Sequence, residues 1–243
     1  MDIAQGLANF RDLGGLPTDN GAVTRSGVLY RSDAPLPGDH SPAAQPWPPV
    51  TVIDLRSDDE PIEPHPLRTP TTLLARFPLL GEARPKTLRE LQAGGAVRLE
   101  VIYRRIVDRV GEEASAVLEL LVSADGPTLI HCAAGKDRTG VLIAILLRAA
   151  GVTHRAIITD YMQTSTAMTS VHRRMSDTGE EVAALIAEFP DAGLTPAEAA
   201  TAVLQQVDGS PGGVASWLTS RGVPVELLKA WRDKLVEQPA AAS

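Results

Sequence analysis

One ten-residue stretch, HCAAGKDRTG at 131–140, separates two apolar segments of the chain. The segment before it, 127–130, ends in Leu-Ile and is typical of a short buried strand. The segment after it, 141–147, has no polar side chain and is typical of a buried helix. The stretch therefore predicts a strand that ends at Cys132, a tight loop, and a helix that begins at Thr139.

The loop between this strand and this helix has the composition of an anion-binding site. Ligands of α/β sheets bind where strands end and helices begin. Consecutive N–H groups at a helix N-terminus form a nest for an anion, and small loop residues let the backbone approach a ligand closely. The predicted phosphate-binding residues are Ala133, Ala134, Gly135, Lys136, Asp137 and Arg138.

Cys132 is the only cysteine of the chain and is expected at the floor of this nest. A helix dipole and nearby cations favour the thiolate over the thiol at such a position. Arg138 can bind two phosphate oxygens with its planar guanidinium, and Thr139 can donate its hydroxyl to the sulfur. These groups predict nucleophilic phosphoryl transfer through a phosphocysteine. No metal or cofactor is predicted, because the loop itself neutralises the phosphate charge.

Other interpretations of the same residues are weaker. A lone cysteine beside a core helix is usually a small buried hydrophobe, but the charged residues that follow Cys132 disfavour that role. A nucleotide-binding P-loop needs Ser or Thr directly after its lysine, whereas Asp137 stands there. His131 can be a zinc ligand, but no second ligand lies at helical or hairpin spacing. We expect it to lie under the loop and to bond the backbone near Cys132.

The motif resembles the loop of cysteine-based phosphatases, and more narrowly that of the bacterial protein tyrosine phosphatase-like family, which reads HCxAGKDRTG. Shorter stretches are also similar to blocks of that family: NFRDLGG at 9–15, LYRS at 29–32, DLRS at 54–57, Asp160-Tyr161, and 212–218. The resemblance implies the cysteine-phosphatase fold and activity on phosphotyrosine. It leaves phosphoserine, phosphothreonine and phosphoinositides open as further substrates.

Strand-like and helix-like segments alternate along the chain. This alternation predicts an α/β fold with a central, mainly parallel sheet flanked by helices and a helical C-terminal part. The further strands are expected at 27–32, 50–56 and 73–79. The helices are expected at 97–110, 112–124, 139–150, 153–164, 213–221 and 224–236, with another that begins after Thr195.

Length and composition favour a single domain over 1–243. Two proline-rich stretches, 38–48 and 61–70, are expected to be loops on either side of a strand. The C-terminal tail, 237–243, is expected to be frayed.

The sequence leaves the general acid open among three carboxylates. Asp137 is favoured because it lies inside the phosphate loop, although it can instead form a salt bridge with Arg56 or Lys136. Asp54 ends a strand beside Arg56, and bracing of the phosphate loop is the more expected role for both. Glu82 is a third candidate, because the loop after strand 73–79 carries no aspartate.

Several other residues have a structural and a functional interpretation. Asn9, Arg11 and Asp12 are expected to form a turn, with pinning of the loop by Arg11 or Asp12 as the alternative. Arg31 can brace the loop from the end of its strand. Tyr103 can line a substrate rim or lie partly in the core. Asp160 with Tyr161 is expected to pack a helix onto a loop.

The formal net charge of −7 and the lack of a basic stripe argue against nucleic-acid binding. The expected partner is a phosphorylated protein or a phosphoinositide. The longest apolar run stops at Arg148, about half the length of a bilayer span. With no signal-peptide pattern at the N-terminus, we expect a cytoplasmic protein, with export by another route left open.

Two alternatives to a phosphatase use the same loop. A non-catalytic module could hold a phosphorylated ligand, but it would have no need for both Cys132 and Arg138. A thiol-dependent reductase of the arsenate-reductase kind would need resolving cysteines, and this chain would have to use an external thiol in their place.

Overall fold

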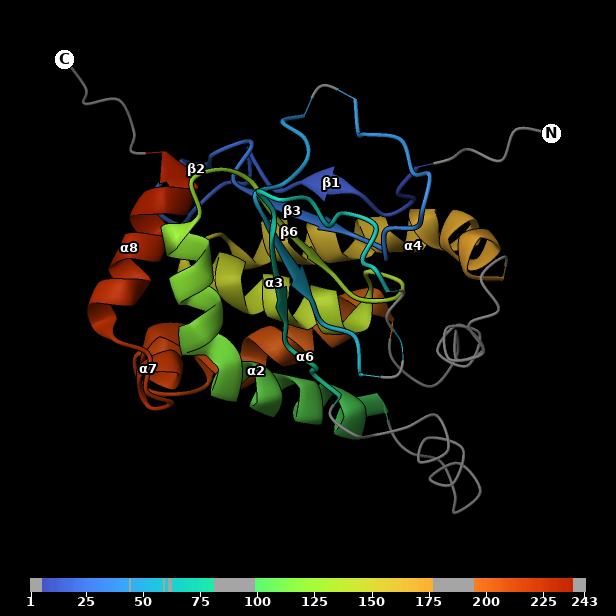
Figure 1. Cartoon of the computed structure of the whole chain (residues 1–243). Coiled ribbons are helices and arrows are strands. Elements are labelled where there is room, and N and C mark those ends of the chain that lie inside the picture. Colours follow the sequence, from blue (N-terminus) through green and yellow to red (C-terminus); the bar gives the residue numbers. More distant parts are fainter. Residues whose placement is uncertain are drawn as a thin grey trace.

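A five-stranded sheet in the order β1–β3–β6–β4–β5 forms the centre of the computed structural model (Figure 1). The model describes residues 6–43, 45–58, 60, 63–80, 99–176 and 195–237. Strands β3, β6, β4 and β5 run parallel, and β1 is antiparallel to β3. The expected mainly parallel sheet is confirmed. The strands are β1 (Arg11–Asp12), β3 (Leu29–Ser32), β4 (Thr51–Asp54), β5 (Leu73–Arg76) and β6 (Thr128–His131).

The register of the sheet brings the ends of three strands together. His131, the last residue of β6, lies between Ser32 of β3 and Asp54 of β4. Carboxyl ends of parallel strands meet at one edge of a sheet, and ligands bind beyond that edge. The loop that follows β6 is therefore surrounded by the loops that follow β3 and β4.

The helices of the described residues follow the expected alternation with the strands. They are α2 (Leu99–Ser123), α3 (Asp137–Ala149), α4 (His154–Ser176), α6 (Pro196–Asp208), α7 (Gly213–Thr219) and α8 (Val225–Leu235). Thr195 caps α6 as expected, since it accepts a hydrogen bond from the Glu198 N–H while the Glu198 carboxylate accepts from the Thr195 N–H. None of these helices is long and apolar enough to cross a membrane.

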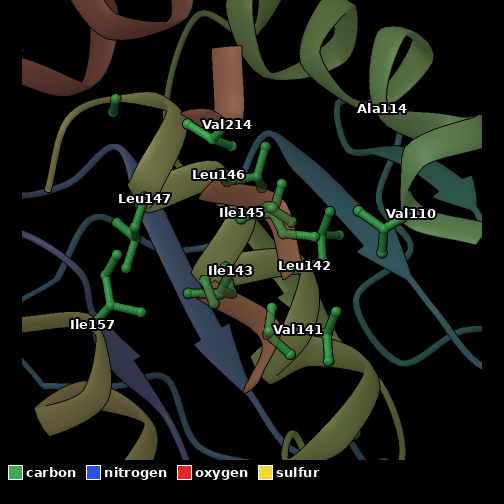
Figure 2. Packing of buried hydrophobic residues seen from close by; sticks show 14 of the residues in the cluster. Val110, Ala114, Val141, Leu142, Ile143, Ile145, Leu146, Leu147, Ile157 and Val214 are labelled. Atoms are coloured by element: carbon green, nitrogen blue, oxygen red, sulfur yellow. The ribbon is translucent and has the colours of Figure 1, made fainter. Parts of the chain in front are cut away.

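Helix α3 is the central helix of the molecule. It contacts α2, α4, α6 and α7, and its residues from Arg138 to Leu147 are all buried. Figure 2 shows its apolar side chains from Val141 to Leu147 packed against Val110 of α2, Ile157 of α4 and Val214 of α7. A helix that is apolar on every face belongs in such a position. Its burial anchors the phosphate-loop end of the helix.

The other face of the sheet is covered by loops. Tyr30, Val52 and Leu129 lie on this face and pack with Phe10, Trp47, Leu67 and Leu74. Trp47 and Leu67 belong to the two proline-rich stretches, which contain no helix or regular strand where they are described. The helices therefore cover one face of the sheet, and the proline-rich loops cover the other face (Figure 1).

The structure corrects the expected division between 97–110 and 112–124. A single helix, α2, runs through Gly111. One glycine costs a helix only about 1 kcal/mol, and packing of α2 against α3 and α8 outweighs that cost. A side chain at Gly111 would overlap Arg221, so the glycine allows the C-terminal helices to approach.

Smaller differences concern boundaries. Helix α3 begins at Asp137 and α4 continues to Ser176, beyond the expected ends. Two short strands that the sequence did not predict, β2 (Val23–Thr24) and β7 (Val236–Glu237), pair with each other. Glu237 therefore belongs to a strand and not to a frayed tail, because β2 supplies its backbone partner. Residues 238–243 and 97–98 lie outside the described residues.

Candidate active site

The backbone carbonyls of the 132–136 loop all accept hydrogen bonds from groups around the loop. Four donors come from neighbouring elements, and the last belongs to α3. His131 Nδ1 lies 3.1 Å from the Cys132 carbonyl oxygen, and Ala34 N donates to the Ala133 carbonyl at 2.8 Å. Asn9 Nδ2 donates to the carbonyls of residues 134 and 135 at 3.0 and 3.1 Å, and Arg31 Nη2 also donates to residue 135 at 2.8 Å. Gly140 N donates to the Lys136 carbonyl at 2.8 Å.

This pattern determines where the loop N–H groups point. A peptide group is planar and trans, so an outward carbonyl sends the following N–H in the opposite direction. The N–H groups of residues 133–137 therefore turn away from those donors, and within the described part of the chain none of them donates to another residue. Together with the N-terminal end of the α3 dipole, they make this loop a candidate anion nest.

Gly135 is the loop position at which no residue with a side chain fits. Its φ is +67°, and an added Cβ would overlap the Ser32 carbonyl at the end of β3. Ala133 and Ala134 are buried against Val171 and Met175 of α4. Small residues at these positions let the loop lie between β3 and α4.

Cys132 directly follows β6 and is only 3% exposed. The thiol is free, as expected for a single cysteine. It lies at the start of the loop, near the positively charged Arg138.

Arg138 is held by a residue that the sequence analysis missed. Its Nη1 and Nη2 donate to the two carboxylate oxygens of Glu60 at 2.6 and 2.9 Å, and both side chains are buried. Burial opposes both charges, but the bonds from Arg138 hold the pKa of Glu60 below its usual value. Cys132 and Glu60 in turn raise the pKa of Arg138. The pair leaves the Nε edge of the guanidinium available for a ligand.

Asp54 and Arg56 form a second buried pair. The Arg56 Nε and Nη2 donate to the Asp54 carboxylate at 3.0 and 2.9 Å. Burial opposes ionisation of Asp54, but the hydrogen bonds and the positive charge of Arg56 lower its pKa. An ionised carboxylate that is already bonded to an arginine is poorly suited to donate a proton. The geometry therefore favours the bracing role over the acid role for Asp54.

Asp137 lies next to a pair of tyrosines. Its Oδ1 accepts a hydrogen bond from the Tyr103 hydroxyl, which lies 3.0 Å from the Tyr161 hydroxyl. The alternative role, a salt bridge to Arg56 or Lys136, is not seen among the described residues, where Arg56 pairs with Asp54 and Tyr103 bonds Asp137. Burial and the negative charge of Asp137 raise the pKa of Tyr103, so it remains a donor.

Thr139 does not make the expected hydrogen bond to the cysteine sulfur. Its hydroxyl is buried and has no partner among the described residues. Thr139 lies in the first turn of α3, which begins at Asp137. Lys136 is the N-cap residue of the helix.

A network of charged residues joins the loop to α4. Asp160 accepts from Arg11 Nε at 2.6 Å and from Arg31 Nη1 at 2.5 Å. Arg31 also bonds the Gly135 carbonyl, and Arg11 bonds Asn9. Asp160 thus pins the loop through two arginines, whereas simple helix-to-loop packing was expected. Asn9, expected in a turn, binds the loop directly.

No second metal ligand lies at helical or hairpin spacing from His131, but the fold brings two distant candidates to it. Asp54 and His65 place candidate metal-ligand atoms within 4.8 Å of those of His131, although neither lies at local spacing in the sequence. His65 was therefore missed along with Glu60. Both follow β4 in loops without a recognisable motif, and only the fold brings them under the phosphate loop. Glu82 lies outside the described residues.

The mainly parallel α/β sheet, with Cys132 between a strand and a helix, is consistent with the phosphatase fold that the sequence resemblance implies. The model of the tyrosine phosphatase family matches residues 3–237. The chain belongs to this family.

Individual relatives support the same assignment. The chain is 29% identical over 146 residues to triple specificity protein phosphatase PtpB of Mycobacterium tuberculosis, covering 55% of this chain and 53% of that protein. It is 32% identical over 172 residues to a Cupriavidus necator protein named as a tyrosine-protein phosphatase, covering 65% and 61%. A shorter match to a tyrosine-protein phosphatase of Nostoc commune is 51% identical over 37 residues, 15% of this chain and 13% of that protein. The first two matches span little more than half of those relatives.

Proposed function

We propose that this chain is a cysteine-dependent phosphatase that hydrolyses phosphate monoesters, with phosphotyrosine as the principal substrate. The observation that carries the proposal is the 132–136 loop after Cys132, whose carbonyls are all bonded to surrounding groups, so that its N–H groups turn away from those groups. Membership of the tyrosine phosphatase family supports this chemistry.

In the first step, the Cys132 thiolate attacks phosphorus. An S–P bond forms while the P–O bond to the leaving group breaks. The loop N–H groups and the Nε edge of Arg138 bind the equatorial oxygens, where negative charge accumulates. Glu60 keeps the opposite edge of the guanidinium occupied, so Arg138 meets the phosphate in a fixed orientation. Asp137 in its protonated form supplies a proton to the leaving oxygen.

In the second step, water hydrolyses the phosphocysteine. The water oxygen bonds to phosphorus, the S–P bond breaks, and Asp137 accepts the proton from water. Inorganic phosphate and the thiolate are released. The hydrogen bond from the Tyr103 hydroxyl holds the Asp137 carboxyl group in place for both steps.

Aryl phosphates are the favoured substrates because a phenolate needs little help to leave. Serine and threonine phosphates place greater demands on Asp137. Lys136 adds positive charge to the loop and keeps phosphoinositide headgroups as a second substrate class.

The test is an assay of phosphotyrosine, phosphoserine and phosphoinositide substrates with EDTA present. We expect the wild type to turn over phosphotyrosine fastest and the Cys132→Ser variant to lose turnover on every substrate while still binding inorganic phosphate. Turnover that survives in Cys132→Ser would exclude the thiolate mechanism. Phosphate binding without turnover in the wild type would identify a ligand-holding module.

A further inference from the structure

A chain of hydrogen bonds runs from the 63–67 loop to the backbone of the nucleophile. The Leu67 N–H donates to His65 Nδ1 at 3.1 Å. His65 Nε2 lies 3.1 Å from His131 Nε2, and His131 Nδ1 lies 3.1 Å from the Cys132 carbonyl oxygen. Both imidazoles are buried, at 7% and 0% exposure.

The chain determines the tautomer of each ring. A backbone N–H can only donate, so His65 Nδ1 is the acceptor and a neutral His65 carries its proton on Nε2. His131 Nε2 then accepts from His65, which leaves the proton of His131 on Nδ1. That proton is directed at the Cys132 carbonyl, which can only accept. Every donor in the series therefore meets an acceptor.

The surroundings keep both rings neutral. Burial is the largest influence on each, and it lowers the pKa of His65 to about 4 and the pKa of His131 below its usual value. Two carboxylates favour protonation: Asp54, whose Oδ1 lies 3.9 Å from His131 Nδ1, and Glu63 beside His65. Two arginines oppose it: Arg56 acts on both rings and Arg138 on His131.

We propose that His65 is a positioning residue for Cys132, acting through the tautomer it imposes on His131. A carbonyl held by His131 turns the N–H of the same peptide group, that of Ala133, into the anion nest. His65 thus lies two hydrogen bonds from the first N–H that meets the substrate phosphate. This inference rests on the proposed phosphatase mechanism and adds a residue outside the motif to it.

A buried metal ion is the competing use of these residues, because Asp54, His65 and His131 lie close together. The bonds already present disfavour it. Arg56 occupies the Asp54 carboxylate, and the ring nitrogens of both histidines are engaged. A cation would have to displace a guanidinium and break the hydrogen-bond chain.

The first test is a long-range ¹H–¹⁵N spectrum of the histidine-labelled wild-type protein, which distinguishes imidazole tautomers without any assay of activity. We expect His131 protonated on Nδ1 and His65 on Nε2 at neutral pH. A His131 ring protonated on Nε2 would overturn the proposal, whether or not the protein is a phosphatase.

The second test uses two variants, each of which keeps one of the two hydrogen-bonding groups of the His65 ring. His65→Gln keeps a donor near the Nε2 position and loses the acceptor for Leu67, whereas His65→Asn keeps that acceptor and loses the donor. We expect His65→Gln to retain the rate at which iodoacetamide alkylates Cys132. We expect His65→Asn to lower that rate and kcat by about fivefold, the size of one hydrogen bond, with KM less affected.

The opposite ranking of the two variants would show that His65 only anchors its own loop, and would overturn the proposal. An equal loss in both would do the same. Thermal unfolding of each variant checks the fold, and the wild-type spectrum decides the case if a variant does not fold. The alkylation rate reports on Cys132 itself, so this result stays separate from the question of substrate turnover.

Discussion

Glu60 shows how a single residue far from the motif shapes the site. Its carboxylate occupies one edge of the Arg138 guanidinium by two hydrogen bonds, and both side chains are buried. A buried arginine without a partner would be costly. Glu60 therefore keeps the charge of Arg138 in place before any phosphate arrives.

For Glu60→Gln we expect a rise in KM for aryl phosphates and a loss in kcat/KM of about tenfold, because the amide carries no negative charge and offers Arg138 one acceptor oxygen in place of two. Steady-state kinetics measure both. Glu112→Gln is the matched control, since Glu112 pairs with Arg109 on the exposed face of α2. Unchanged kinetics in Glu60→Gln would mean that Arg138 keeps its orientation without this carboxylate.

The contribution of Asp137 to the rate is expected to increase with the basicity of the leaving group. For Asp137→Asn we predict little change with an activated aryl phosphate and a loss of about 100-fold in kcat with an alkyl phosphate. A series of substrates with leaving groups of increasing basicity gives the slope of log kcat against leaving-group pKa. A slope equal to that of the wild type would remove Asp137 from the role of general acid.

At the scale of elements, the contact between α3 and α4 links packing to chemistry. Gly140, in the first turns of α3, lies against the ring of Tyr161 on α4. The Tyr161 hydroxyl reaches Tyr103, which holds Asp137. The close approach of the two helices thus positions a candidate catalytic carboxylate.

Gly140→Ala should therefore destabilise the protein, although alanine is the better helix former. Its methyl group would overlap the Tyr161 ring, and overpacking of this kind costs about 1–3 kcal/mol. Urea unfolding measures the change, and a second substitution, Tyr161→Leu, should recover part of it. A more stable Gly140→Ala variant would contradict the contact.

The elements around the motif could be predicted because their signals are local. Strand β6, the loop and α3 follow from the apolar runs beside Cys132, and Thr195 predicts the start of α6. The two-residue strands β1, β2 and β7 have too few residues for any periodicity. Glu60 and His65 could not be assigned, because their roles depend on where the chain passes after β4.

At the scale of the whole molecule, buried carboxylates and a buried neutral histidine determine how the free energy of unfolding depends on pH. The pKa of Asp160 is lowered by Arg31 and Arg11, against the effect of burial, and the pKa of Glu60 is likewise lowered. These carboxylates stabilise the fold at pH values above their unfolded pKa and lose that contribution as pH falls. His65 is neutral in the fold and has a pKa of about 4 there, against 6.5 when unfolded.

The expected result is a free energy of unfolding that is highest near neutral pH and falls below pH 6.5. Between about pH 6.5 and 4 the unfolded chain binds a proton at residue 65 that the folded chain does not, so acid favours unfolding. Below about pH 4 the paired carboxylates add to the loss. Urea unfolding across this range measures the slope, which should be shallower in His65→Gln. The same pH dependence in the wild type and in His65→Gln would show that residue 65 is in contact with solvent in the folded protein.

The central claim is that Cys132 carries the phosphoryl group during turnover. The most direct measurement is the intact mass of the protein after mixing with an aryl phosphate and rapid quenching in acid. We predict a species heavier by one phosphoryl group in the wild type, located on the peptide that contains Cys132, and its absence in Cys132→Ser. Steady turnover with no such species, or with the label on another residue, would contradict the account.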